Sequence, residues 1–219
     1  MVNPLRAGSQ RPLAAAVYLA RHGETASNTR GRYAGQSAES LTAPGRAQVL
    51  RLADQLHDHA LEEIWTSNIR RAVESAELLG ARFRVPIHVE QRLTEIRMGP
   101  WEGLTEKEVA AAYPAAYKLW QQRPDRLRLR GRETLGKVGR RVTAVLAEAR
   151  ARSGGVLLVT HVAPIRVALL TTVGLPLSWY QQVPVANADC FVISGTPPFV
   201  RRLNRTESFF DDLDLAVSG

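Results

Sequence analysis

Val17-Tyr-Leu-Ala-Arg21-His22-Gly23-Glu24-Thr25 decides the fold of this chain, because an apolar run ends there abruptly at chemically active side chains. A short apolar run of this kind is typical of a buried strand. Parallel α/β sheets place their chemistry at the carboxyl ends of their strands. At such an end the His22 imidazole can act as a nucleophile, and the adjacent Arg21 guanidinium can hold a phosphate through paired hydrogen bonds. The stretch therefore predicts both a central strand and a phosphate-handling site.

Strand and helix patterns alternate along the rest of the chain. Beyond the first strand at 17–20, strands are predicted at 61–66, 85–89 and 156–160, with edge strands at 190–194 and 199–203. Helices are predicted at 44–59, 68–83, 133–152 and 163–173, and residues 31–42 read as a polar loop. This alternation predicts an α/β fold, a three-layer α/β/α sandwich around a mostly parallel central sheet.

The length of 219 residues suits one domain with a small insertion. Residues 1–12 lack periodicity and are expected to form a flexible N-terminal arm. A single domain is predicted over 13–205, and a C-terminal tail over 206–219. Within the domain, residues 96–132 interrupt the alternation and contain two short helical patterns, near 105–112 and 115–122. We interpret this segment as a small helical cap.

Composition limits the partners that we expect. The net charge of +8 comes almost entirely from arginines that are interspersed with Asp and Glu, which does not favour nucleic-acid binding. The single cysteine, Cys190, allows no intramolecular disulfide. No apolar run is long enough to span a membrane, and residues 13–20 run directly into Arg21 without a cleavage site. We therefore expect a cytoplasmic protein with neither nucleic acid nor membrane as partner, and either a monomer or a homodimer.

Five segments further along the chain belong to the same sequence pattern as the opening stretch. They are Leu41-Thr42-Ala-Pro-Gly45, Ser67-Asn-Ile-Arg-Arg71-Ala72, Leu93-Thr-Glu95, Gly131-Arg-Glu133-Thr134 and Val156-Leu-Leu-Val-Thr-His161. Together with Arg-His-Gly-Glu-Thr after the first strand, and in this order, they resemble the signature of the histidine phosphatase superfamily, in the branch that includes cofactor-dependent phosphoglycerate mutase. The resemblance extends from residue 17 to about residue 194.

The resemblance implies a catalytic set of His22, Glu95, His161, Arg21 and Arg71. His22 would attack phosphorus and become phosphohistidine, which divides one difficult step into two easier ones. Arg21 and Arg71 would clamp the phosphoryl oxygens with their planar guanidinium groups. His161 would stabilise the equatorial oxygens in the transition state. Glu95 would act as general acid and then as general base.

The residues expected to bind substrate are Arg21, Asn28, Arg71, His161, Gln36, Thr42 and Val162. Val162-Ala163-Pro164 departs from the glycine-containing sequence that the family often has after its second histidine, so substrate contacts differ there. Glu24 and Glu102 remain rivals to Glu95 for the acid. Ser67 is expected to support the pocket. Glu133 either orients a catalytic residue or serves only as an acid in the first turn of its helix.

The predicted function is a metal-independent phosphatase that acts on a small phosphorylated metabolite and needs no cofactor. No His, Cys or carboxylate cluster has the spacing of metal ligands. Phosphoglycerate mutase is the main alternative, and a non-catalytic binding protein on the same fold is a second. The short interval 99–132 favours the phosphatase, because the family's mutases carry a longer insertion there. The alternating segment Arg126-Leu-Arg-Leu-Arg130 either lines the mouth of the pocket or forms a solvated edge.

Overall fold

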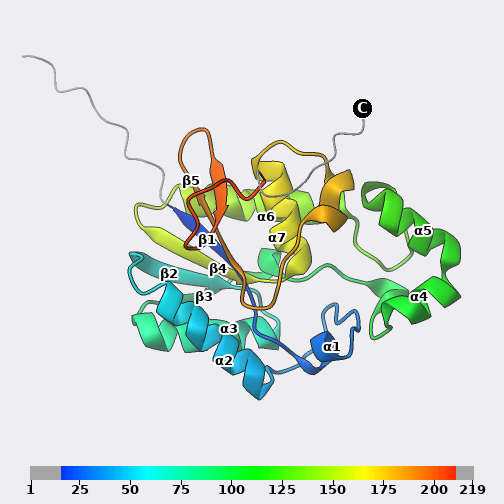
Figure 1. Ribbon diagram of the computed structural model, residues 1–219, viewed down its shortest axis with the longest axis horizontal. Helices are drawn as coiled ribbons and strands as arrows, with labels where there is room; N and C mark the ends of the chain where they lie inside the picture. Colours follow the sequence, from blue (N-terminus) through cyan, green and yellow to red (C-terminus); the bar gives the residue numbers. More distant parts are fainter. Residues whose placement is uncertain (1–15, 211–219) are drawn as a thin grey trace, which may run out of the picture.

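The computed structural model describes residues 16–210, which fold around one six-stranded sheet (Figure 1). The strands are β1 Val17–Arg21, β2 Leu61–Thr66, β3 Ile87–Val89, β4 Gly155–Thr160, β5 Cys190–Ser194 and β6 Phe199–Arg202. Their order across the sheet is β3-β2-β4-β1-β5-β6. The first four run parallel to one another, and β5 and β6 complete one edge in antiparallel fashion.

Helices cover both faces of the sheet. α2 (Ala43–Gln55) and α3 (Arg70–Phe83) pack on one face, and α6 (Leu135–Arg150) and α7 (Val162–Thr172) pack on the other (Figure 1). Outside the cap, the short helical segments are α1 Ala26–Thr29, η1 Gln91–Leu93 and η4 Leu177–Gln182. This arrangement confirms the three-layer α/β/α sandwich with a mostly parallel sheet.

The side chains of β1 explain why a continuous apolar run marks the centre of the fold. Val17 and Leu19 join the apolar cluster under α6 and α7, whereas Tyr18 and Ala20 join the cluster under α2 and α3. All four are buried, because successive residues of a strand point to opposite faces and both faces carry helices. Only the last residue, Arg21, reaches the open end of the sheet.

The cap consists of η2 (Gly99–Trp101), α4 (Glu106–Ala112), α5 (Pro114–Gln122) and η3 (Pro124–Arg126), drawn in green at one end of the molecule in Figure 1. The Thr105 hydroxyl caps α4, and a proline opens α5. The centre of the cap is the buried Arg132 guanidinium, which lies 5.1 Å from the Trp101 ring and 4.1 Å from the Trp120 ring. This packing ties the cap to the main apolar core.

Some boundaries differ from the expectations. α2 ends at Gln55 rather than near residue 59, and α6 starts at Leu135 rather than residue 133, because Thr134 is its N-cap. The predicted arm at 1–12 lies outside the described residues, as do residues 211–219 of the predicted tail. The domain itself continues past residue 205, since Phe209 is buried against Phe191.

The alternating arginine segment forms a solvated edge and does not line the cavity described below. Leu127 is buried, whereas Arg126, Arg128 and Arg130 are exposed. Among residues 16–210, no helix is both long enough and apolar enough to cross a membrane.

Candidate active site

Three adjacent parallel strands end at the same edge of the sheet and bring together residues that are far apart in sequence. β1 and β4 pair with Arg21 opposite Thr160, so His22 and His161 follow their strands side by side. Their ring centroids are 5.1 Å apart. β2 pairs with β4 on the other side, with Thr66 opposite Val159, and delivers Ser67 to the same place. The register of the sheet therefore assembles the predicted histidine pair.

Gly23 allows the end of β1 to lie tightly against α2. A Cβ atom at this position would lie 2.3 Å from the carbonyl oxygen of Gly45, closer than real contacts permit. Gly45 has the same constraint in return, because its own Cβ would lie 2.2 Å from the carbonyl oxygen of Glu24. The two glycines thus hold the loop after His22 in one position.

Hydrogen bonds fix the tautomer of His22. Its Nδ1 lies 2.7 Å from the carbonyl oxygen of Gly23, and a carbonyl can only accept, so Nδ1 carries the proton. Nε2 accepts a hydrogen bond of 3.1 Å from Nε of Arg71. Burial, together with Arg71 and Arg21, holds the pKa of His22 well below its usual value. A neutral ring with its Nε2 lone pair turned towards Arg71 is prepared to attack phosphorus.

His161 is completely buried beside His22. Its Nε2 lies 2.8 Å from the Ser67 hydroxyl, whose oxygen also accepts from the backbone amide of Ile69. Nδ1 of His161 has no hydrogen-bond partner within residues 16–210. Burial and the nearby Arg71 hold the pKa of His161 well below its usual value. Ser67 therefore orients one ring nitrogen, and the other is buried without a partner beside His22.

The two predicted clamp arginines are held by carbonyl oxygens. Nη1 of Arg21 donates to the carbonyl of Val185 at 2.9 Å. Arg71 is 1% exposed and donates from Nη1 to Ser37 and from Nη2 to Gly35, at 2.9 and 2.7 Å. Burial lowers the pKa of Arg21 to about 10, so both guanidinium groups stay charged at neutral pH. Neither forms an ion pair with a carboxylate in the part of the chain that the structure describes, so their charge is available to an anion.

Glu95 is the carboxylate nearest to this chemistry. Its Oε1 accepts from the backbone amides of Ile96 and Ala163, at 2.8 and 3.2 Å. Burial raises its pKa although these amides and Arg71 oppose the change. The rivals are engaged elsewhere, since Glu24 accepts from the hydroxyl of Thr42 and Glu102 accepts from the backbone amide of Gln36. Glu95 therefore matches a general acid more closely than either rival does.

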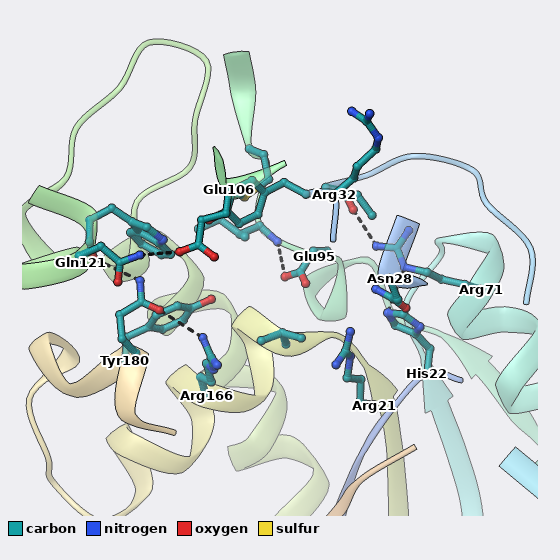
Figure 2. Close-up of a pocket in the computed structure, with 18 residues that line it drawn as sticks. Arg21, His22, Asn28, Arg32, Arg71, Glu95, Glu106, Gln121, Arg166 and Tyr180 are labelled. Atoms are coloured by element: carbon teal, nitrogen blue, oxygen red, sulfur yellow. Dashed lines mark hydrogen bonds between the residues drawn. The ribbon is translucent and has the colours of Figure 1, made fainter. Parts of the chain in front are cut away.

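Arg21, His22, Arg71 and Glu95 open into one cavity of about 290 Å³, whereas the buried His161 and Ser67 do not line it (Figure 2). One end is lined by Arg21, His22, Asn28, Arg71 and Glu95. The rest is lined by Arg32, Tyr33, Ala34, Gly35, Ile96, Met98, Glu106, Trp120, Gln121, Val162, Arg166, Tyr180 and Gln181.

The other predicted substrate residues divide into two groups. Asn28 and Val162 line the cavity. The Asn28 carbonyl oxygen accepts from the amide of Thr25 and from Asn187, so its NH₂ group remains to donate to a ligand. Gln36 and Thr42 do not line it, because the Gln36 side chain donates to the backbone carbonyl of Glu95 and Thr42 caps α2. This geometry does not favour direct contact of Gln36 or Thr42 with substrate.

Glu133 has neither of the two predicted roles. Its carboxylate pairs with Arg141 through two hydrogen bonds of 3.0 and 3.1 Å, and Arg141 also donates to the carbonyl of Arg92. Glu133 therefore fastens α6 to the segment before Glu95. It orients neither a catalytic arginine nor a histidine, and it precedes the N-cap of its helix.

Sequence reasoning missed several residues at the site, among them Glu106, Gln121, Arg166, Tyr180 and Asn187. Asn187 donates to Asn28 and lies in an irregular segment after η4 that has no periodic pattern. Glu106, Gln121 and Arg166 lie in the cap and on α7, where the helical pattern was visible but the face turned to the cavity was not. Tyr180 lies in η4, for which no element was predicted. Among residues 16–210 there is no group of three or more His, Cys, Asp or Glu side chains arranged to hold a metal ion.

Comparison with known proteins agrees with this geometry. Residues 17–204 match the family model described as histidine phosphatase superfamily (branch 1). The chain is 31% identical over 179 residues to phosphoserine phosphatase 1 of Hydrogenobacter thermophilus, which covers 81% of this chain and 85% of the relative. It is 33% identical over 156 residues to a 6-phosphofructo-2-kinase/fructose-2,6-bisphosphatase of Gallus gallus, of which it spans only 32%.

Among solved structures, the mycobacterial glucosyl-3-phosphoglycerate phosphatase in complex with VO3 superimposes with a TM-score of 0.78. That match has 28% identity and covers 86% of this chain and 97% of the other. Residues 17–204, which the family model matches, contain every strand of the sheet and all the side chains that were predicted to be catalytic. On the family match and these relatives, the chain belongs to the histidine phosphatase superfamily.

Proposed function

We propose that this protein hydrolyses small phosphomonoesters through a phosphohistidine formed on Nε2 of His22. The observation that carries the proposal is the state of His22. Its ring is neutral, with the proton on Nδ1 held by Gly23, and Nε2 faces Arg71 in a cavity that also contains Glu95. A nucleophile, two cations and a proton donor are the parts that metal-independent phosphoryl transfer requires.

In the first half of the reaction, the Nε2 lone pair forms a bond to phosphorus while the bond from phosphorus to the leaving oxygen breaks. Glu95 gives its proton to that oxygen, so the leaving group departs as an alcohol. In the second half, Glu95 takes a proton from water, the water oxygen bonds to phosphorus, and the P–N bond returns its electron pair to His22. Inorganic phosphate is the product.

The charge that develops on the phosphoryl oxygens is met by donors that the fold fixes beforehand. Arg21 and Arg71 bring full charges, Asn28 brings its NH₂ group, and the neutral His161 ring brings its unpartnered Nδ1–H when the Ser67 hydroxyl donates to Nε2. Donors fixed before the reaction cost no reorganisation in the transition state.

Relatives support the phosphatase class but differ in substrate. One is named for phosphoserine and another for glucosyl-3-phosphoglycerate, so their names share only the hydrolysis of a phosphate ester. The substrate of this chain therefore depends on what its own cavity can bind. The alternative of a phosphoglycerate mutase is carried by the family resemblance alone.

The experiment that tests the proposal supplies 3-phosphoglycerate with a trace of bisphosphoglycerate, and separately supplies nitrophenyl phosphate, to the purified protein. We expect release of inorganic phosphate from nitrophenyl phosphate and little formation of 2-phosphoglycerate. His22→Ala is the control, and acid-labile phosphate trapped on the wild-type protein by rapid quench identifies the intermediate. Isomerisation well ahead of phosphate release would establish the mutase, and the absence of both activities would favour a binding protein.

A further inference from the structure

The half of the cavity beyond Glu95 is not used by phosphoryl transfer. We call it the distal half and define it by Tyr33, Glu106, Gln121, Arg166 and Tyr180, all of which line the cavity. In the proposed reaction the phosphoryl group lies against His22, so the leaving group must occupy the distal half. These residues therefore bear on which leaving group the site accepts. The inference drawn from them rests on the proposed function.

Glu106 points into the distal half from the cap (Figure 2). It is the first residue of α4, and its Oε1 accepts from the hydroxyl of Tyr117 and from Nε2 of Gln121, the latter at 2.9 Å. These bonds hold Oε1, and Oε2 accepts no hydrogen bond within residues 16–210. Glu106 forms no ion pair within residues 16–210, so its negative charge is not cancelled by a neighbour.

Arg166 enters the distal half from the opposite wall, on α7 (Figure 2). Its Nε donates to the carbonyl of Val183 at 2.7 Å, and its guanidinium lies 4.9 Å from the centre of the Tyr180 ring. Nη1 reaches the side-chain oxygen of Gln181 at 3.5 Å. Hydrogen bonds thus hold one edge of the Arg166 guanidinium, and the Tyr180 ring packs against its face. The group still presents N–H bonds to the cavity that it lines.

The other arginine of this region contributes little free charge. Nη1 of Arg32 forms a 3.1 Å ion pair with Glu108, on the same cap helix as Glu106. The distal half therefore contains one unpaired carboxylate, one guanidinium and several uncharged polar groups. Burial, with Glu106 beside it, raises the pKa of Tyr33 to about 12, so its phenol stays protonated and can donate.

From this arrangement we infer that the distal half binds an uncharged, hydroxyl-rich leaving group, such as one sugar unit, and that Glu106 determines this specificity. A hydroxyl both donates and accepts, so a ring with several hydroxyls can donate to Glu106 and to the side-chain oxygen of Gln121, and can accept from Arg166. The aromatic rings of Tyr180 and Trp120 supply apolar surface for the ring carbons. At about 290 Å³ the cavity is at the small end of ligand sites, which suits a phosphate with one such group.

Charged leaving groups fit less well. A carboxylate beside the phosphoester would meet the unpaired charge of Glu106 in the same cavity, and like charges repel. An amino acid carries its ammonium and carboxylate on one carbon atom, whereas Glu106 and Arg166 lie on opposite walls and form no ion pair with each other. A compact zwitterion would leave the side-chain oxygen of Gln121 and the phenol of Tyr33 without a ligand partner, which costs binding free energy.

The test compares kcat/KM for four phosphomonoesters, namely a hexose 6-phosphate, phosphoserine, 3-phosphoglycerate and nitrophenyl phosphate. We expect the hexose phosphate to exceed phosphoserine and 3-phosphoglycerate by about tenfold or more. Glu106→Ala should lower the hexose value about 3- to 10-fold, the loss expected for one or two exposed hydrogen bonds. Glu106→Gln should keep most of the hexose activity, because an amide still accepts, and should raise the value for 3-phosphoglycerate.

Glu77→Gln is the matched control, since Glu77 is an exposed carboxylate on α3 that does not line the cavity. It makes the same change in net charge and should leave all four ratios as they are. If Glu106→Gln lowers phosphoserine far more than the hexose phosphate, the carboxylate binds an ammonium and the inference is wrong. If wild type hydrolyses nitrophenyl phosphate but prefers 3-phosphoglycerate, the inference also fails while the proposed function stands. Failure to hydrolyse any of the four would refute both.

Discussion

Replacing Glu95 by Gln tests the chemistry most directly, because the substitution removes a proton and almost nothing else. Oε1 of Glu95 is occupied by the amides of Ile96 and Ala163, so Oε2 is the oxygen that can hold the transferable proton. A glutamine oxygen can accept the same two bonds, and its NH₂ group occupies the place of Oε2. The fold and the charges of Arg21 and Arg71 should be retained.

The size of the effect depends on the leaving group. A general acid typically contributes ~10²–10⁴-fold, which corresponds to about 2.7–5.5 kcal/mol of activation free energy. An alkyl phosphate releases a poor leaving group and should lose this full amount. A nitrophenolate is stable without a proton, so nitrophenyl phosphate should lose no more than about tenfold. The assay is kcat/KM for both esters in wild type and Glu95→Gln.

The pH profile supplies a second readout. A general acid works only when protonated, and burial raises the pKa of Glu95, so more of it is protonated near neutral pH than for an ordinary glutamate. Activity on the alkyl ester should therefore fall as pH rises through that pKa. His22 must be unprotonated to attack phosphorus. Because its pKa is depressed, activity should fall at acid pH only below the usual pKa of a histidine. Equal losses for the two esters, or an alkaline limb that persists in Glu95→Gln, would remove Glu95 from this role.

Further outcomes follow from the same geometry. His22→Ala should lose at least ~10³-fold in rate and trap no acid-labile phosphate, and near-normal turnover would overturn the covalent mechanism. Chelators should leave the activity unchanged, because Arg21 and Arg71 supply the positive charge, and loss in EDTA that a divalent ion restores would contradict this. Arg132→Met should change the free energy of unfolding by no more than about 1 kcal/mol, because two cation–π contacts offset two buried guanidinium nitrogens without hydrogen-bond partners. Arg132→Ala should cost at least about 2 kcal/mol through the cavity it leaves, and urea unfolding of both variants separates lost packing from lost charge.

The strand ends were the part of the site that the sequence could predict. An apolar run that stops at Arg21-His22, and another that stops at His161, reveal their positions because burial on both faces requires continuous apolar residues. Parallel pairing then brings the two ends together, so the histidine pair follows from topology. Arg71 and Glu95 were placed only through the resemblance, since one lies on a helix and the other in an irregular segment.

The cap could not be predicted at the same level. Its two short helices were visible as patterns, but Glu106 is held by Tyr117 and Gln121 on the next helix. The cap in turn packs around Arg132, which lies 31 positions after Trp101. Thr42 and Gln36 illustrate the opposite error. Both belong to segments that resemble the family or adjoin its site, yet their polar atoms are used to cap α2 and to hold the backbone at Glu95.

The distal half also bears on the choice between phosphatase and mutase. A phosphoglycerate carries a carboxylate next to its phosphoester, and a mutase must hold that second anion while the phosphoryl group moves. The cavity wall formed by the cap presents Glu106 instead, and the arginines at 126, 128 and 130 that could reverse this charge are exposed on the solvated edge. A carboxylate at this wall would repel the second anion that a mutase must retain, whereas it would not hinder an alcohol from leaving. The residue that we infer to select the substrate therefore also favours hydrolysis.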